Sequence, residues 1–156
     1  MIDRLSIAIK FENNDLIPNK TEFDICGLAQ EAVKLIKDKY KDREIVLECE
    51  PSKVFADRTM IEMVIINLLD NALKYSDSEV KILIKNKEVK VIDKGIGINE
   101  EDLEKITKKF YRVRRNTWDN SMGLGLYLVM YILKLHNSEL KIDSTYKKGS
   151  IFSFKL

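Results

Sequence analysis

The stretch that decides the fold is Ile65-Ile66-Asn67-Leu68-Leu69-Asp70-Asn71-Ala72-Leu73-Lys74-Tyr75-Ser76. It lies in an apolar-periodic run that begins near Thr59, which predicts a helix with one buried face. Asn67 and Asn71 are four residues apart, so they lie on the same side of that helix. Their amide oxygens can share a Mg²⁺ ion with water and substrate phosphates. On this stretch alone, amides that bond backbone groups or face water explain the pattern equally well.

The composition indicates an ordinary globular protein with one domain. The chain has 156 residues, of which 45% are hydrophobic and 33% charged, and its formal charge is +2. This near-balance favours neither a nucleic acid nor a membrane surface as partner. No run reaches the ~18 apolar residues of a membrane span, and the N-terminus lacks a signal-peptide pattern. Cys26 and Cys49 have no metal-ligand spacing; we expect two buried thiols in a reducing compartment, with a disulfide as the alternative.

Periodicity and turn residues predict an α+β two-layer sandwich, with one mixed sheet covered on one face by helices. Asp24 and Asp57 stand where helix N-caps are expected. Asn86-Lys87 lies between two apolar runs and predicts a hairpin. The first 11 residues look like the last turns of an amphipathic helix. The expected strands are residues 21–25, 44–48, 53–56, 80–84, 89–92, 139–144 and 150–155; helices are expected from Asp24 to about Tyr40, from Asp57 through Ser76, over residues 100–106, and up to His136.

Two glycine segments bracket a long polar connection. Asp93 ends an apolar strand and is followed by Gly95 and Gly97. A carboxylate there can accept a hydrogen bond from an exocyclic amine such as that of adenine, although a tight turn with a surface aspartate is an alternative. Gly123-Leu124-Gly125 opens a helix whose N-terminus can meet a phosphate. The pattern is neither a P-loop nor a dinucleotide fingerprint. The basic side chains between the two segments either contact phosphates or form a solvated loop.

Taken together and in order, these motifs resemble the catalytic ATP-binding domain of sensor histidine kinases. The resemblance covers residues 21–156 and includes Lys109-Phe110-Tyr111-Arg112 and the last-strand Gly149. It implies the Bergerat fold of the GHKL superfamily, with a lid over about residues 98–122. Residues 1–20 would be the remnant of a preceding dimerisation and phosphotransfer helix, followed by a linker.

The resemblance also implies roles for individual residues. Asn67 and Asn71 would bind Mg²⁺, Asp93 would read the adenine amine, and Arg112 would reach the terminal phosphates and stabilise charge during transfer. With Asn67, Asn71 and Arg112 as the catalytic set, the remaining ATP-binding residues implied are Lys74, Tyr75, Gly95, Gly97, Ile98, Phe110, Gly123, Leu124 and Gly125. Ser121-Met122 departs from the family's usual Gly-Thr, which puts phosphate contacts at that corner in doubt.

The phosphoacceptor histidine of the family is absent. His136 stands at a helix end beside Asn137, which suits a left-handed cap, so we interpret it as structural. The implied partners are therefore the protein's own dimerisation and histidine-phosphotransfer domain, in a homodimer, and a response regulator downstream. The resemblance places the domain in the cytoplasm, as part of a membrane-bound bacterial sensor kinase, with no direct contact to membrane or nucleic acid.

Three rival functions are considered. Related ATP hydrolases place a glutamate base where this chain has Asn67, an amide that cannot take a proton from water, and Asp70 points about a quarter turn away from Asn71. We therefore expect negligible ATP hydrolysis. A regulatory module that holds ATP without transferring phosphate is a second possibility, supported by Ser121-Met122. A scaffold with a decayed pocket is a third.

Overall fold

The structure is a computed structural model that describes residues 17–95, 125–145 and 147–156. The predictions for residues 1–16 and for 96–124, which include the helical patch and the lid, lie outside this range. The observed elements are β1 (Thr21–Asp24), α2 (Ile25–Lys39), β2 (Ile45–Cys49), β3 (Lys53–Ala56), α3 (Arg58–Lys74), β4 (Val80–Lys85), β5 (Glu88–Asp93), α5 (Gly125–Leu135), β6 (Lys141–Thr145) and β7 (Gly149–Lys155).

The strands form a five-stranded mixed sheet in the order β2-β4-β5-β7-β6. β2 and β4 are parallel, and the other neighbours are antiparallel. β1 and β3 pair separately as a two-stranded sheet, with Thr21 opposite Ala56. The mixed sheet expected from the sequence is present, and a small second sheet accompanies it, because β1, which precedes α2, pairs with β3, which precedes α3.

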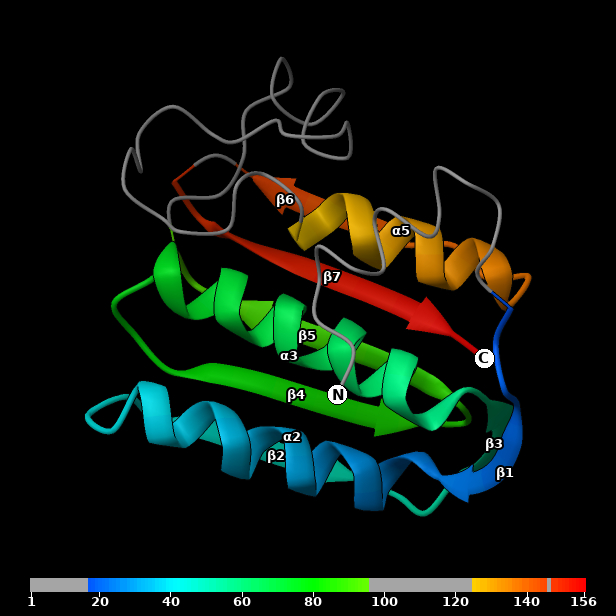
Figure 1. The fold of residues 1–156 in the computed structure, drawn as a ribbon. Coiled ribbons are helices and arrows are strands. Elements are labelled where there is room, and N and C mark those ends of the chain that lie inside the picture. The colour runs from blue at the N-terminus through cyan, green and yellow to red at the C-terminus, as the bar shows by residue number, and fades with distance from the viewer. Residues whose placement is uncertain (1–16, 96–124, 146) are drawn as a thin grey trace.

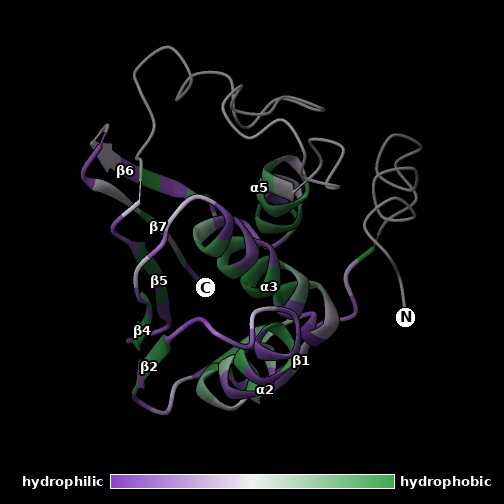
Figure 2. Ribbon diagram, turned by 90° about the vertical axis from the view of Figure 1, so that its left-hand side faces the viewer, coloured by the Kyte–Doolittle hydropathy of each residue, from purple (hydrophilic) through white to green (hydrophobic). Residues whose placement is uncertain are grey.

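Helices cover one face of the large sheet, and α3 packs between α2 and α5 (Figure 1). Alternate strand residues point toward the helices, which is the period-2 pattern of a sheet with one buried face. Figure 2 shows these two layers side on, with strands on one side and helices on the other. The inward-facing strand residues include Val80, Ile82, Ile84, Val89, Val91, Phe152 and Phe154.

Side-chain caps set both helix starts that the sequence predicted. The Asp24 carboxylate accepts a hydrogen bond from the backbone N–H of Cys26 at 3.0 Å. The Asp57 carboxylate accepts one from the N–H of Met60 at 3.1 Å. Each cap satisfies a donor that has no partner within its own helix. α3 therefore begins at a defined point relative to β3, and this sets the position of Asn67 and Asn71 along the sheet.

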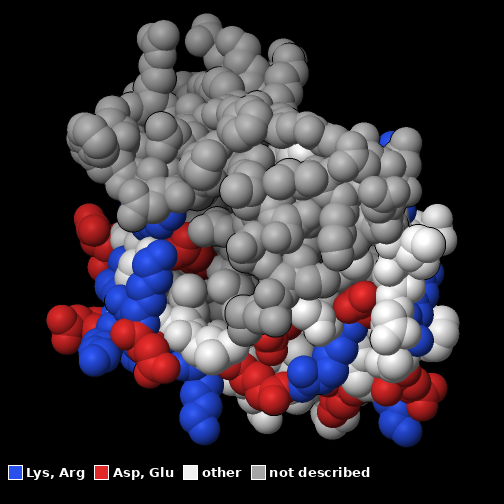
Figure 3. Space-filling model, in the orientation of Figure 1, with Lys and Arg blue, Asp and Glu red and all other residues white. Residues whose placement is uncertain are grey.

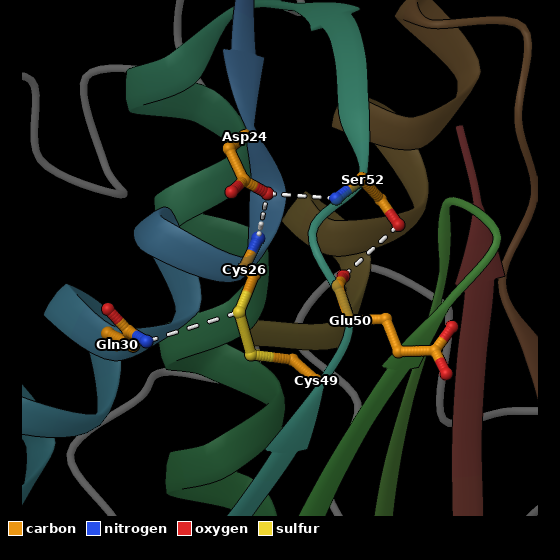
Figure 4. Close-up of a disulfide and its surroundings, with 6 residues drawn as sticks. All are labelled: Asp24, Cys26, Gln30, Cys49, Glu50 and Ser52. Atoms are coloured by element: carbon orange, nitrogen blue, oxygen red, sulfur yellow. Dashed lines mark hydrogen bonds between the residues drawn. A yellow bond between two sulfur atoms is a disulfide. The ribbon is translucent and has the colours of Figure 1, made fainter.

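The two cysteines form a disulfide, so the prediction of two reduced thiols is wrong. Cys26 lies in the first turn of α2 and Cys49 ends β2, and their Cα atoms are 5.7 Å apart. Figure 4 shows the contact that brings the two cysteines close. The Asp24 carboxylate accepts the N–H of Ser52 at 2.9 Å in addition to that of Cys26. One carboxylate thus holds the start of α2 to the turn after β2, a contact between segments distant in sequence.

The end of α5 follows the capping prediction. Asn137 adopts a left-handed φ of 56°, its N–H donates to Lys134 O, and the N–H of Ser138 donates to Leu133 O. These two bonds form a Schellman motif, which satisfies the last carbonyl groups of the helix. His136 is part of this end: its Nδ1 lies 2.7 Å from Ile132 O, and its Nε2 accepts the N–H of Asp57 at 3.0 Å. The structural interpretation of His136 is confirmed.

Candidate nucleotide site

The candidate site is built on the last two turns of α3. Asn67 is 8% exposed, and its amide nitrogen donates to Met63 O at 2.8 Å. Asn71 lies one turn later and is half-buried. Because the nitrogen of Asn67 donates to backbone, its oxygen is the end that a hard cation would meet. The alternative that the sequence left open, an amide that bonds a backbone group, is therefore also present at Asn67.

Lys74 and Tyr75 end the same helix. Lys74 is its last residue, and Tyr75 is the C-cap, whose N–H donates to Asn71 O at 3.2 Å. The Lys74 ammonium lies 3.2 Å from the Asp70 carboxylate, one helical turn away. An ammonium group near a helix C-terminus is electrostatically favourable and can also reach an anionic ligand.

Asp70 does not have the surroundings of a general base. One of its oxygens accepts from the Tyr40 hydroxyl at 2.7 Å and from the Lys39 ammonium at 3.2 Å, and the other faces Lys74. Burial alone would raise the pKa of Asp70, but Tyr40, Lys74 and Lys39 together hold that pKa below its ordinary value. A carboxylate whose charged form is stabilised in this way is a weaker proton acceptor, which agrees with the expectation of negligible hydrolysis.

Asp93 is the second buried carboxylate near α3, at the end of β5. It is 6% exposed and faces the helix-covered side of the sheet. Its Oδ1 accepts the N–H of Gly95 at 2.9 Å. Burial raises the pKa of Asp93, although the backbone N–H groups of Gly95 and Ser150 counteract part of that effect. The tight turn considered from the sequence is present, but its aspartate is buried and not on the surface.

Gly95 brings this turn against the end of α3. A Cβ atom on Gly95 would lie 2.0 Å from Tyr75 O and 2.9 Å from the Ser76 Cβ. Only a residue without a side chain permits this approach. Gly149, at φ 119°, makes a similar approach to the backbone of Asp93, where a Cβ would lie 2.2 Å from the Asp93 carbonyl oxygen. The asparagine helix, the aspartate strand and the last strand therefore meet at one corner of the fold.

The remaining predicted site residues are mostly outside the described range. Gly125 is the first residue of α5. Gly97, Ile98, Phe110, Arg112, Gly123 and Leu124 fall within residues 96–124. Over the part of the chain that the structure describes, no three His, Cys, Asp or Glu side chains gather to hold a metal ion. A cation here would rely on amide oxygens and on ligand phosphates, which suits the donor set of Asn67 and Asn71.

Charge on the described surface drawn in Figure 3 is mixed in sign. On the face drawn in Figure 3, basic and acidic side chains of the described residues lie next to one another rather than in separate patches. No helix among the described residues has the length and apolar character needed to cross a bilayer.

The comparison with protein families decides the assignment. Residues 56–156 match the family described as histidine kinase-, DNA gyrase B-, and HSP90-like ATPase. The chain belongs to this family. The matched residues contain α3, the hairpin and the last strand, the elements that meet at the corner described above. The resemblance to the ATP-binding domain of sensor histidine kinases and the α+β sandwich, both inferred from the sequence, are confirmed.

Proteins similar to this chain include sensor kinases. The adaptive-response sensory kinase SasA of Gloeothece citriformis is 32% identical over 160 residues, covering 96% of this chain and 41% of that protein. The sensor-like histidine kinase SenX3 of Mycobacterium bovis is 28% identical over 167 residues, covering 100% of this chain and 41% of that protein. The chain thus spans about two fifths of the length of these relatives.

Solved structures of histidine kinases have the same fold. The catalytic domain of histidine kinase ThkA superposes with a TM-score of 0.74 at 28% identity, covering 88% of this chain and 95% of that one. The Acinetobacter baumannii histidine kinase AdeS gives a TM-score of 0.78 at 28% identity, covering 98% and 74% respectively. The chain is therefore homologous to the catalytic domains of sensor histidine kinases.

Sequence reasoning missed the residues that support the site from α2 and the turn after it. Tyr40 and Lys39 bond Asp70, and Arg43 bonds the segment that follows α3. These contacts join residues about 30 positions apart. No local pattern in a single sequence indicates them.

Proposed function

We propose that this domain binds Mg-ATP and supplies the γ-phosphate to a histidine on a separate helical domain of the same protein, for relay to a response regulator. The observation that carries the proposal is the junction of Gly95 with Tyr75 and Ser76, which sets the buried Asp93 beside the end of the helix that carries Asn67 and Asn71. The names of the relatives support the same reaction class. ATP is a cytoplasmic metabolite, so we place the domain in the cytoplasm.

In this proposal each group has one task. Asn67 and Asn71 would hold Mg²⁺ through their amide oxygens, and the metal would neutralise charge on the phosphates. Lys74 would contact phosphate, and Tyr75 would pack near the ribose and base. Ionised Asp93 would accept a hydrogen bond from the adenine amine. Arg112, with Phe110 anchoring the lid, would stabilise charge on the terminal phosphates. Gly97, Ile98, Gly123, Leu124 and Gly125 would line the nucleotide.

Calorimetric titration of the 156-residue chain with ATP, with and without Mg²⁺, tests the binding step. We expect Asp93→Ala to abolish binding and Asn71→Ala to remove its dependence on magnesium. Asp38→Ala, at an exposed position of α2, is the control and should bind as the parent does. A ligand at a hundred times its dissociation constant stabilises a fold by about 2.7 kcal/mol. A parent chain that gives no heat of binding and gains no thermal stability in excess Mg-ATP would contradict the proposal.

Phosphate transfer needs a second experiment. The domain, mixed with its own helical phosphotransfer domain and labelled ATP, should label the histidine of that domain. A nucleotide-binding regulatory module would bind ATP but leave the histidine unlabelled. An ATPase of the gyrase kind would release phosphate without the partner, and Asp70→Ala would abolish that release.

A further inference from the structure

Arg43 lies in the turn between α2 and β2 and bonds three groups around the end of α3. Its Nη1 donates to Leu73 O at 2.6 Å, and its Nη2 donates to the Ser76 hydroxyl at 3.0 Å and to Ser78 O at 2.9 Å. The planar guanidinium can reach several acceptors at fixed angles, which an ammonium cannot do. One side chain therefore fixes both the last turn of α3 and the loop after it.

Arg43 is itself held to α2. Its N–H donates to Tyr40 O at 3.2 Å, and its carbonyl oxygen accepts from the Lys37 ammonium at 2.6 Å. On the other side of the turn, Glu44 O accepts the N–H of Val80 at 3.1 Å. The Arg43 side chain thus extends from a backbone that is itself held in place. Its hydrogen bonds therefore fix where the end of α3 lies relative to α2.

The segment that Arg43 holds is the one that Gly95 contacts. Ser76 receives the Arg43 bond and donates its own hydroxyl to Ala72 O at 2.7 Å. Its Cβ atom and Tyr75 O are the atoms closest to the Cβ position of Gly95. The end of α3 is therefore held by Arg43 from the turn after α2, and it meets the Asp93 turn through Gly95. Displacing this segment would move Lys74 and Tyr75 relative to Asp93.

We propose that Arg43 is a positioning residue of the nucleotide site, which acts through Ser76 to hold Lys74 and Tyr75 in register with Asp93. This inference rests on the proposed function. Arg43 touches no nucleotide in this account. Its loss weakens ATP binding because the phosphate-contacting and base-contacting groups no longer share one geometry.

The test compares ATP dissociation constants of folded variants. Arg43→Met should weaken ATP binding about tenfold, the effect of losing a charged hydrogen bond. Arg43→Lys, which keeps the charge but not the fork, should give an intermediate value. Arg58→Lys is the matched control, because Arg58 is an exposed arginine of α3 whose guanidinium pairs with Glu31 on the surface. It should bind ATP as the parent does. Circular dichroism at the titration temperature establishes that each variant is folded.

A double-mutant cycle separates positioning from general stabilisation. If Arg43 acts through Ser76, Arg43→Met combined with Ser76→Ala should weaken ATP binding no further than Arg43→Met alone. A residue that only stabilises the fold would lower the urea midpoint and leave the dissociation constant of folded protein unchanged. That result, or additive effects on binding, overturns the inference. If Arg43→Met does not fold, Arg43→Lys decides, and parent-like binding by it overturns the inference.

The two proposals fail differently. If the parent chain does not bind ATP, or Asp93→Ala binds it equally well, the proposed function is wrong. If the parent binds ATP, Asp93→Ala does not, and the folded Arg43 variants bind as the parent does, only the role of Arg43 is wrong.

Discussion

At the scale of single residues, Asp70 links α2 to α3. It is 7% exposed and has Tyr40, Lys39 and Lys74 as partners. We expect Asp70→Asn to lower the free energy of unfolding by about 2 kcal/mol, because three donors lose an ionic acceptor in a buried place. The Lys39 share is small, since its side chain is 58% exposed and screened by solvent. Urea unfolding at pH 7 measures the change, and Asp77→Asn, at an exposed position, should show none.

The acid limb of stability gives a second readout of Asp70. Its pKa in the folded protein is below the ordinary 3.8, so its stabilisation is complete above about pH 3.8 and is lost as the pH falls through the folded-state value. The Asn variant should lack this component of the acid loss. Asp93 acts in the opposite direction: its pKa is raised, so its ionisation costs stability as the pH rises through the folded-state value.

His136 predicts a pH dependence nearer neutrality. Its Nε2 accepts the Asp57 N–H and its Nδ1 faces Ile132 O, which requires the neutral ring. Burial lowers the pKa of His136, with a further lowering from Lys20, against raising effects from the Ile132 bond and Asp57. The folded pKa lies below the ordinary 6.5, so this stabilisation is complete above about pH 6.5 and is lost as the pH falls.

Replacing His136 with Gln tests this assignment. A glutamine oxygen can accept the same backbone N–H without titrating. We expect the parent to lose stability in urea between pH 7 and 5 and His136→Gln to lose less over that interval. Equal slopes for both proteins would exclude His136 as the source.

At the scale of elements, the β4–β5 hairpin carries local strain. Asn86 and Lys87 have φ values of 53° and 66°, the arrangement of a type I′ turn. Asparagine tolerates the left-handed region, but in lysine the Cβ atom lies too close to the following carbonyl oxygen, which destabilises this conformation. Lys87→Gly should therefore stabilise the domain by about 0.5–1 kcal/mol. Lys85→Gly, on an exposed strand position nearby, should destabilise it instead, because there the backbone is extended. Thermal unfolding of both variants provides the measurement.

What the sequence predicted well is what local chemistry determines. Asp24, Asp57 and Asn137 cap helices within a few residues of their own position, and Asn86-Lys87 closes a hairpin between adjacent strands. Such features depend on short segments and can be read in one dimension. Element bounds accordingly agree to within one or two residues for most strands.

What it could not predict are contacts between segments distant in the chain. The Cys26–Cys49 disulfide, the Asp70–Tyr40 bond and the Arg43 bonds join α2 or its flanking turns to other elements. Nothing in cysteine spacing or in a basic turn specifies the partner. The buried position of Asp93 also depends on how β5 meets α3 and β7, which a motif alone does not reveal.

At the scale of the whole molecule, the disulfide adds a covalent link to the helix layer. Cys26 and Cys49 enclose a separation of 23 residues. Closing a loop of this size stabilises a fold by about 3 kcal/mol in the chain-entropy account. We expect dithiothreitol to lower the urea midpoint of the parent accordingly. The double variant Cys26→Ser, Cys49→Ser should unfold at the urea midpoint of the reduced parent. Dithiothreitol should not change the urea midpoint of this variant. Because a reducing cytoplasm opens most disulfides, ATP binding should be measured in both forms.

Asp57 gathers more of the molecule than its place at a helix start suggests. Its carboxylate accepts the N–H of Asn19 at 2.8 Å as well as that of Met60, while its own N–H donates to His136. The backbone at Asn19, the start of α3 and the end of α5 are therefore all bonded to this one residue. A pulling force applied to the chain ahead of Asn19 would act on Asp57 before it acts on any strand of the large sheet. Through Asp57 the same force would act on α3 and α5 together.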